Sequence, residues 1–105
     1  QETLTAHQAA DTLRLLGHSH ADTAADVTVM DEFVGPGYTR PTDSMREALS
    51  LAARFEGLVL DPVYTGKAFA GFIALARSGR YGKDQSLLFM HTGGSPGLFG
   101  YPESF

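Results

Sequence analysis

The sequence predicts an α/β fold with a parallel sheet and flanking helices. Two short segments with apolar cores, residues 58–60 and 86–91, are separated by a helical pattern, and a glycine-containing loop follows each segment. When strands and helices alternate in this order, the strands are expected to be parallel, and ligands bind at the carboxyl edge of the sheet. We therefore expect loops 61–67 and 91–96 to open on one shared pocket.

The composition is that of one modest globular domain. The chain has 105 residues, 43% of them hydrophobic, and a formal net charge of -4. Its basic residues are scattered and form no stripe for a phosphate backbone, so no nucleic-acid partner is expected. The longest apolar stretch, residues 68–76, is about half of the ~20 residues that a bilayer crossing needs, so no membrane contact is expected.

The amino terminus and the residue usage suggest a cytoplasmic origin. The first residues have no signal-peptide character, and the chain contains no cysteine for disulfides or zinc. His18 and His20 lie in a polar loop without a carboxylate cluster, so no metal site is expected. Because the chain begins with Gln1 and its first helix follows no strand, we expect a piece of a longer protein.

The first half of the chain is expected to contain two helices and a strand. The helical period from Glu2 to Leu16 predicts a helix that stops at Gly17, and residues 27–33 predict a short strand before a turn at 35–38. A second helix should begin at Thr42 or Ser44 and end at Gly57. The predicted apolar face of that helix contains Met45, Ala48, Leu49, Ala52 and Phe55.

The second half is expected to form a strand–helix–strand unit. Asp61-Pro62 prevents a helix after residues 58–60, which therefore predict a buried strand. A third helix should run from Thr65 to Ser78-Gly79, and residues 86–91, apolar on both faces, predict a second buried strand. Ser95-Pro96 predicts the cap of a last short helix over residues 97–101.

The right-handed crossover of this unit would bring Tyr64-Thr65 and Thr92-Gly93 to one rim. Glycines 66, 93 and 94 would let main-chain amides approach a flat, polar ligand. The alternative is that Gly93-Gly94 only permits a tight turn and Tyr64 only packs. Lys67 is expected to face solvent or a carboxylate, and His91 to form a local hydrogen bond.

A serine-hydrolase elbow is formally present at Gly93-Gly94-Ser95-Pro96-Gly97. In that motif the residue after the serine donates its main-chain N–H to the oxyanion hole, and Pro96 has none. No histidine follows Ser95 in the sequence either. Serine hydrolysis is therefore not expected.

Around these loops the sequence resembles the D-cysteine desulfhydrase and 1-aminocyclopropane-1-carboxylate deaminase family. Its members are pyridoxal-phosphate enzymes of the tryptophan-synthase β-like fold, fold type II. The resemblance is weak over residues 1–25 and is carried from about Asp26 onward by four motifs in family order: Gly35-Pro36-Gly37-Tyr38, Ala53-Arg54-Phe55-Glu56-Gly57, Leu60-Asp61-Pro62-Val63-Tyr64-Thr65-Gly66-Lys67 and Leu88-Phe89-Met90-His91-Thr92-Gly93-Gly94.

The resemblance implies that residues 1–105 are the carboxyl-terminal part of the large domain of a homodimeric enzyme with an amino-acid substrate. The Schiff-base lysine for pyridoxal 5'-phosphate would lie upstream, so the segment alone would be inactive. Tyr38 and Tyr64 match the family's two active-site tyrosines and are the catalytic candidates. Thr65, Thr92 and Gly93 are the candidates for cofactor binding.

The residues at 65 and 92 bear on the substrate. The resemblance implies that deaminases of the family have a carboxylate at the first position and a leucine at the second, whereas desulfhydrases have hydroxyl residues at both. This chain has two hydroxyl residues, Thr65 and Thr92. A neutral hydroxyl favours a weaker electron sink, which suffices for β-elimination. The resemblance thus implies conversion of D-cysteine to pyruvate, ammonia and sulfide. The alternatives are a deaminase, a cysteate sulfo-lyase or, in a different class, a non-catalytic ligand-binding domain.

Overall fold

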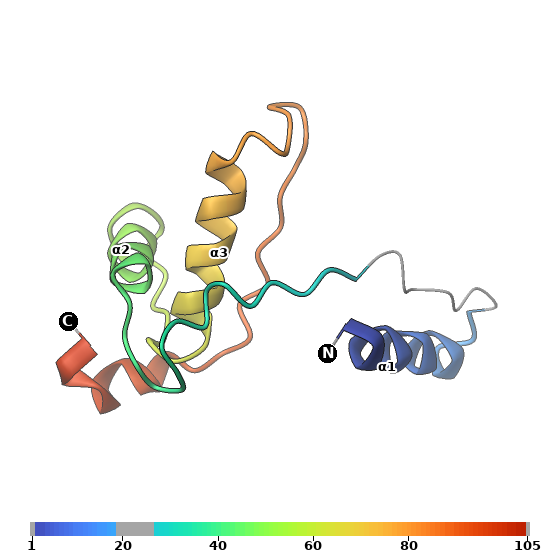
Figure 1. Cartoon of the computed structure of the whole chain (residues 1–105), viewed down its shortest axis with the longest axis horizontal. Coiled ribbons are helices and arrows are strands. Elements are labelled where there is room, and N and C mark those ends of the chain that lie inside the picture. The colour runs from blue at the N-terminus through green and yellow to red at the C-terminus, as the bar shows by residue number, and fades with distance from the viewer. Residues whose placement is uncertain (1, 19–26, 105) are drawn as a thin grey trace. The chain divides into compact units, whose positions relative to one another are not determined.

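The computed structural model describes residues 2–18 and 27–104, which divide into two units, residues 1–31 and 32–105. The first unit contains α1, Glu2–Leu15 (Figure 1). Helix α1 ends as predicted, because Gly17 adopts a left-handed conformation with φ of 80°. Within this unit the Glu2 carboxylate accepts a hydrogen bond from the main-chain N–H of Val29 at 2.9 Å. His20 lies outside the described residues.

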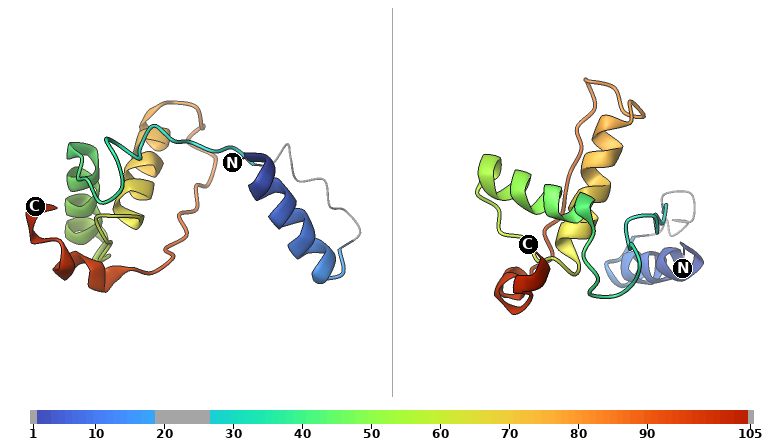
Figure 2. Two further views of the ribbon diagram at one scale, coloured as in Figure 1. Left: turned by 60° about the horizontal axis from the view of Figure 1, so that its bottom comes forward. Right: turned by 60° about the vertical axis from the view of Figure 1, so that its left-hand side comes forward.

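The second unit is built on a pair of helices, α2 (Asp43–Leu51) and α3 (Thr65–Arg77), which contact each other and lie next to each other in the left-hand view of Figure 2. Thr42 is the cap of α2, since its hydroxyl accepts from the N–H of Met45, so of the two predicted caps the structure selects Thr42. A π-helical turn η2, Ala52–Glu56, continues α2 to Gly57, the predicted end. Two 3-10 helices, η3 (Ser95–Gly100) and η4 (Pro102–Ser104), complete the chain.

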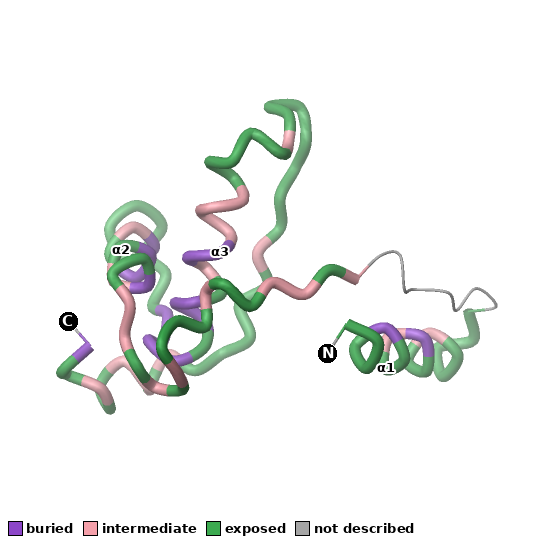
Figure 3. The backbone as a smooth tube through the Cα atoms, viewed as in Figure 1, coloured by how far each residue is buried: buried purple, intermediate pink, exposed green. Residues whose placement is uncertain are grey.

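The core of this unit lies between α2, η2 and the start of α3, where Figure 3 shows the buried backbone concentrated. Its centre is apolar, and three partly buried side chains pack around it: Met45, Leu49, Ala52 and Leu60, with Phe69, Phe89 and Leu98. The prediction that Phe55 lies on the buried apolar face is wrong, because its side chain is 71% exposed. The wider π-helical turn rotates this position away from the stripe that an α-helix would continue.

The predicted parallel sheet is wrong: the structure has no strand anywhere in residues 2–18 and 27–104. A strand requires a neighbouring strand to accept and donate its main-chain hydrogen bonds. Instead, the carbonyl oxygen of Val59 accepts from the side chains of Ser95, at 2.7 Å, and His91, at 3.2 Å. Residues 86–91 return along α3 without regular structure, and Leu88 is 86% exposed.

A smaller difference concerns the start of the last helix. The last helix begins at Ser95 rather than 97 and is 3-10, and Ser95 does not cap it, because its hydroxyl donates to Val59. Within α3, Ala70 and Gly71 are buried, whereas Ala68 is exposed. At Gly71 the ring of Phe33 packs so closely that a β-carbon would lie 3.1 Å from it. None of the helices in the described residues has the length and hydropathy needed to cross a bilayer.

Candidate functional site

The site is organised by Asp61, which lies in the turn that leads into α3. Its carboxylate is buried and accepts hydrogen bonds from the main-chain N–H groups of Val63 (2.8 Å), Tyr64 (2.7 Å) and Thr65 (2.9 Å). The first N–H groups of a helix have no partner within the helix, so a carboxylate placed here both satisfies them and interacts with the positive end of the helix dipole. Asp61 thereby fixes the start of α3.

The same carboxylate determines what the Thr65 hydroxyl does. Oγ1 of Thr65 donates to Oδ1 of Asp61 at 2.6 Å and accepts from the main-chain N–H of Asp61 at 2.9 Å. Thr65 is only 3% exposed. The proton of this cofactor-binding candidate is therefore committed to Asp61, and one lone pair of the oxygen is left for any further partner.

Asp61 also joins the two loops that the sequence predicts to share a pocket. A β-carbon on Gly94 would lie 2.8 Å from Oδ1 of Asp61, and one on Gly97 would lie 3.3 Å from its β-carbon. Gly94 has φ of 86°, which favours glycine. We call this contact between residues 61–65 and 93–97 the Asp61 junction. The two loops converge as predicted. The Asp61 carboxylate and the helix starts bring them together, however, and not the edge of a sheet.

The balance of interactions lowers the pKa of Asp61. Burial acts to raise this pKa, but the hydrogen bonds from the Thr65 hydroxyl and from the three main-chain N–H groups outweigh it, so the pKa lies below its ordinary value of 3.8. Asp61 is therefore a carboxylate at neutral pH. No group of three or more side chains of the metal-ligating types gathers within residues 2–18 and 27–104.

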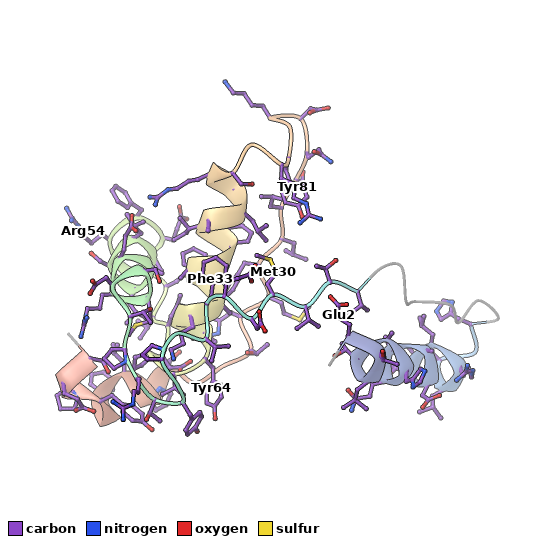
Figure 4. All side chains as sticks on the ribbon, in the orientation of Figure 1. Glu2, Met30, Phe33, Arg54, Tyr64 and Tyr81 are labelled. Atoms are coloured by element: carbon purple, nitrogen blue, oxygen red, sulfur yellow. The ribbon has the colours of Figure 1, made fainter. Side chains whose placement is uncertain are left out.

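The two catalytic candidates converge at the start of α3, where Figure 4 places Tyr64. The hydroxyl oxygens of Tyr38 and Tyr64 lie 2.6 Å apart, and the rings are tilted by 59°. Both side chains are largely exposed, Tyr38 by 68% and Tyr64 by 61%. We call these residues the tyrosine pair. Since one proton lies between the two oxygens, the pair has a second hydroxyl proton that can be donated to a ligand.

The hydrogen bond with Tyr38 raises the pKa of Tyr64 above its ordinary value of 10.0. Desolvation and the nearby Tyr38, Tyr101 and Asp61 act in the same direction. Tyr64 therefore keeps its proton at neutral pH, so that it is suited to donate a proton or a hydrogen bond.

Gly93 and Thr92 are accessible to a ligand, whereas Gly66 is buried. Gly93 is exposed, has φ of 102° and would meet no atom within 4 Å at its β-carbon position, so its backbone is open to a flat ligand, and Thr92 beside it is exposed. Gly66 is different, because a β-carbon there would lie 2.7 Å from the Asp61 carbonyl oxygen and 3.0 Å from Leu49. The expected ligand approach at Gly66 is therefore wrong, and this glycine serves helix packing.

Among the residues that the structure describes, Lys67 neither faces solvent nor pairs with a carboxylate, so both expectations for this residue are wrong. It is 7% exposed, and its ammonium donates to the carbonyl oxygens of Val34, at 2.6 Å, and Gly37, at 3.0 Å. His91 does form the expected local hydrogen bonds, accepting from the N–H of Gly93 at Nδ1 and reaching Val59 through Nε2. The sequence reasoning missed Asp61 and Lys67 as organising residues. An aspartate followed by proline, with threonine four residues on, was the signal for Asp61.

Comparison with known proteins gives consistent matches. The sequence profile of the family described as "Pyridoxal-phosphate dependent enzyme" matches residues 1–93. Proteins named D-cysteine desulfhydrase from Salmonella typhi and Salmonella newport (strain SL254) are each 49% identical over 77 residues, which is 73% of this chain. The chain spans 24% of the length of these relatives.

Proposed function

This chain belongs to the pyridoxal-phosphate dependent enzyme family, and we propose that the whole protein is a lyase that releases pyruvate, ammonia and sulfide from D-cysteine. The family membership agrees with the resemblance in the Gly35–Tyr38, Leu60–Lys67 and Leu88–Gly94 motifs. The observation that supports this role for the site is the tyrosine pair, two exposed phenols 2.6 Å apart at the start of α3, whose preceding turn meets Gly94 through Asp61.

The donor chemistry of this rim fits one side of pyridoxal phosphate with its amino acid. When bound, that cofactor supplies the electron sink for negative charge at the substrate Cα. Gly93 offers open space for a flat ring, and Thr92 adds an exposed hydroxyl. Thr65 offers one unused lone pair, since its other interactions are with Asp61. Neither phenol is buried, so both can reach a ligand.

In the proposed reaction the tyrosine pair holds a proton at Oη of Tyr64 for the departing sulfur. The Cβ–S bond breaks with its electron pair on sulfur while the pair at Cα forms the Cα–Cβ double bond, and the departing sulfide accepts a hydrogen bond from the tyrosine pair. The raised pKa of Tyr64 suits this role, because the residue is protonated before the step. Asp61 holds the main chain of Tyr64 in place.

The full-length protein provides the test. We expect an absorbance band of the bound cofactor and release of pyruvate and sulfide from D-cysteine, with much less from L-cysteine, cysteate or 1-aminocyclopropane-1-carboxylate. Folded full-length protein with neither signal would refute the proposal. Sulfite from cysteate, or 2-oxobutanoate from the cyclopropane substrate, as the dominant product would move the assignment to the corresponding alternative.

The hydroxyls at Thr65 and Thr92 are proposed to set this preference. Thr65→Glu combined with Thr92→Leu should lower turnover of D-cysteine by about 10-fold or more, because a carboxylate replaces a neutral hydroxyl in the site. Unchanged turnover would remove the role from both residues. A homodimer is proposed from the resemblance alone, and sedimentation of the full-length protein tests it. A cytoplasmic location is proposed from the residue usage.

A further inference from the structure

Lys67 lies in the first turn of α3, three residues after Tyr64, and its ammonium is withdrawn from solvent. Both of its acceptors are main-chain carbonyls, at Val34 and Gly37, 33 and 30 residues earlier in the sequence. A buried ammonium is costly unless it is hydrogen-bonded, so these two bonds hold the segment before Tyr38 against α3. We call this arrangement the lysine clamp.

The segment that the clamp holds has an unusual backbone. Gly35 has φ of 72°, Gly37 has φ of 151°, and Thr39 is a non-glycine residue with φ of 61°. A residue stays in such a sparsely populated backbone conformation only when the surrounding contacts hold it there. Gly37, whose carbonyl the clamp binds, immediately precedes Tyr38. The same carbonyl accepts from the main-chain N–H of Arg40 at 3.2 Å, so the clamp ties the turn that carries Tyr38 to α3.

The tyrosine pair has little else to fix it. Both rings are mostly exposed, so core packing does not orient them. The hydroxyl–hydroxyl bond joins residues 26 apart in sequence, and a single exposed hydrogen bond contributes only about 1 kcal/mol. Asp61 binds the main-chain N–H of Tyr64, and the lysine clamp binds the carbonyl of Gly37, next to Tyr38.

We propose that Lys67 is a positioning residue which sets the Tyr38 hydroxyl against Tyr64 by binding the carbonyls of Val34 and Gly37. Its effect on catalysis rests on the proposed function, but its effect on the tyrosine pair does not. Lys67 acts through the two tyrosines and touches neither substrate nor cofactor.

The first test follows the tyrosine pair in the full-length holoprotein. The pKa of Tyr64 is measured by NMR of ¹³C-labelled tyrosine rings, with Tyr64→Phe to assign the signal. In Lys67→Met the pair should separate, so the pKa of Tyr64 should fall toward its ordinary value, as it should in Tyr38→Phe. Lys83→Met, which changes an exposed lysine in the turn after α3, is the matched control and should leave this pKa unchanged.

The second test separates positioning from folding. Lys67→Met should lower kcat for D-cysteine by about 10- to 100-fold, as expected for a displaced catalytic group, with KM changed less and the cofactor absorbance retained. Lys67→Gln, a milder change that keeps a polar side chain, should act in the same direction and carries the test if Lys67→Met does not fold. Lys67→Arg keeps the charge and the donors and should restore most of the turnover.

The outcomes distinguish this proposal from the previous one. A pKa of Tyr64 that stays at the wild-type value in both Lys67→Met and Lys67→Gln would overturn the lysine clamp. Losses in kcat that simply add in the double variant of Lys67→Met and Tyr38→Phe would overturn it as well, because residues acting as one unit are not additive. If the pKa of Tyr64 shifts as expected while the wild type releases no pyruvate, the clamp stands and the proposed substrate fails.

Discussion

Residues 61–67 and residues 86–91 lie in the same unit of the molecule but are ordered in very different ways. In the first segment the carboxylate of Asp61 binds three main-chain N–H groups, all within four residues of it. In the second segment Leu88 and Met90 are 86% and 73% exposed, and the structure describes no strand there. Interactions within one turn of chain are sufficient for a helix start, whereas a strand depends on a partner strand elsewhere.

The largest effect is expected from removing the centre of the Asp61 junction. Asp61→Ala deletes four acceptor interactions and leaves buried N–H groups unpaired, so the free energy of unfolding should fall by about 3 kcal/mol. Urea denaturation measures this change. Asp31→Ala, at an exposed position in irregular chain, is the control and should stay within about 0.5 kcal/mol of wild type. Equal effects of the two variants would erase the contrast between the segments.

A somewhat smaller effect is expected where the junction meets the second loop. Gly94→Ala places a β-carbon 2.8 Å from Oδ1 of Asp61 at a φ that favours glycine, which should cost about 2 kcal/mol of unfolding free energy. Gly100→Ala is the control, because nothing lies within 4 Å of its β-carbon position. The same denaturation assay applies, and a harmless Gly94→Ala would show that the loops do not touch through Asp61.

The cap of α2 offers a third comparison, between the two residues that the sequence left as alternatives. Thr42→Ala removes the hydroxyl that accepts from the N–H of Met45 and should lower the thermal stability by about 1 kcal/mol. Ser44→Ala should cost clearly less, since that N–H keeps its acceptor. The reverse order, measured by thermal denaturation under identical conditions, would assign the cap to Ser44.

The smallest effect is expected from acid, because protonation leaves the shape of Asp61 intact. The pKa of Asp61 is lowered on folding, so its contribution to stability is complete above the ordinary value of 3.8 and is lost as the pH falls through the lower folded value. The stability difference between wild type and Asp61→Asn should therefore shrink as the pH drops below 3.8. A difference that is independent of pH in this range would show that the charge of Asp61 has no role.

The features that could be predicted from the sequence are those with local causes. The start of α3 at Thr65, the stop at Gly57 and the turn at residues 35–38 follow from glycine, proline and capping residues close by in the chain. The family resemblance named Tyr38 and Tyr64 as site residues, but no local rule predicts that the hydroxyls of residues 26 apart meet.

The features that were missed depend on contacts distant in the sequence or on unusual local geometry. The exposure of Phe55 follows from a π-helical turn that the helical period does not encode. The clamp at Lys67 depends on carbonyls 30 and 33 residues away. The strand expected over residues 86–91 rested on an apolar run, and hydrophobicity specifies burial without supplying a pairing partner.

Amide hydrogen exchange of this 105-residue chain tests most directly whether the Asp61 junction is the ordered centre of the site. The amides of Val63, Tyr64 and Thr65 should exchange at least about 10-fold more slowly, relative to their intrinsic rates, than those of Leu87, Leu88 and Phe89, and Asp61→Ala should abolish this protection. Equal protection in the two segments, or protection that survives Asp61→Ala, would contradict the account.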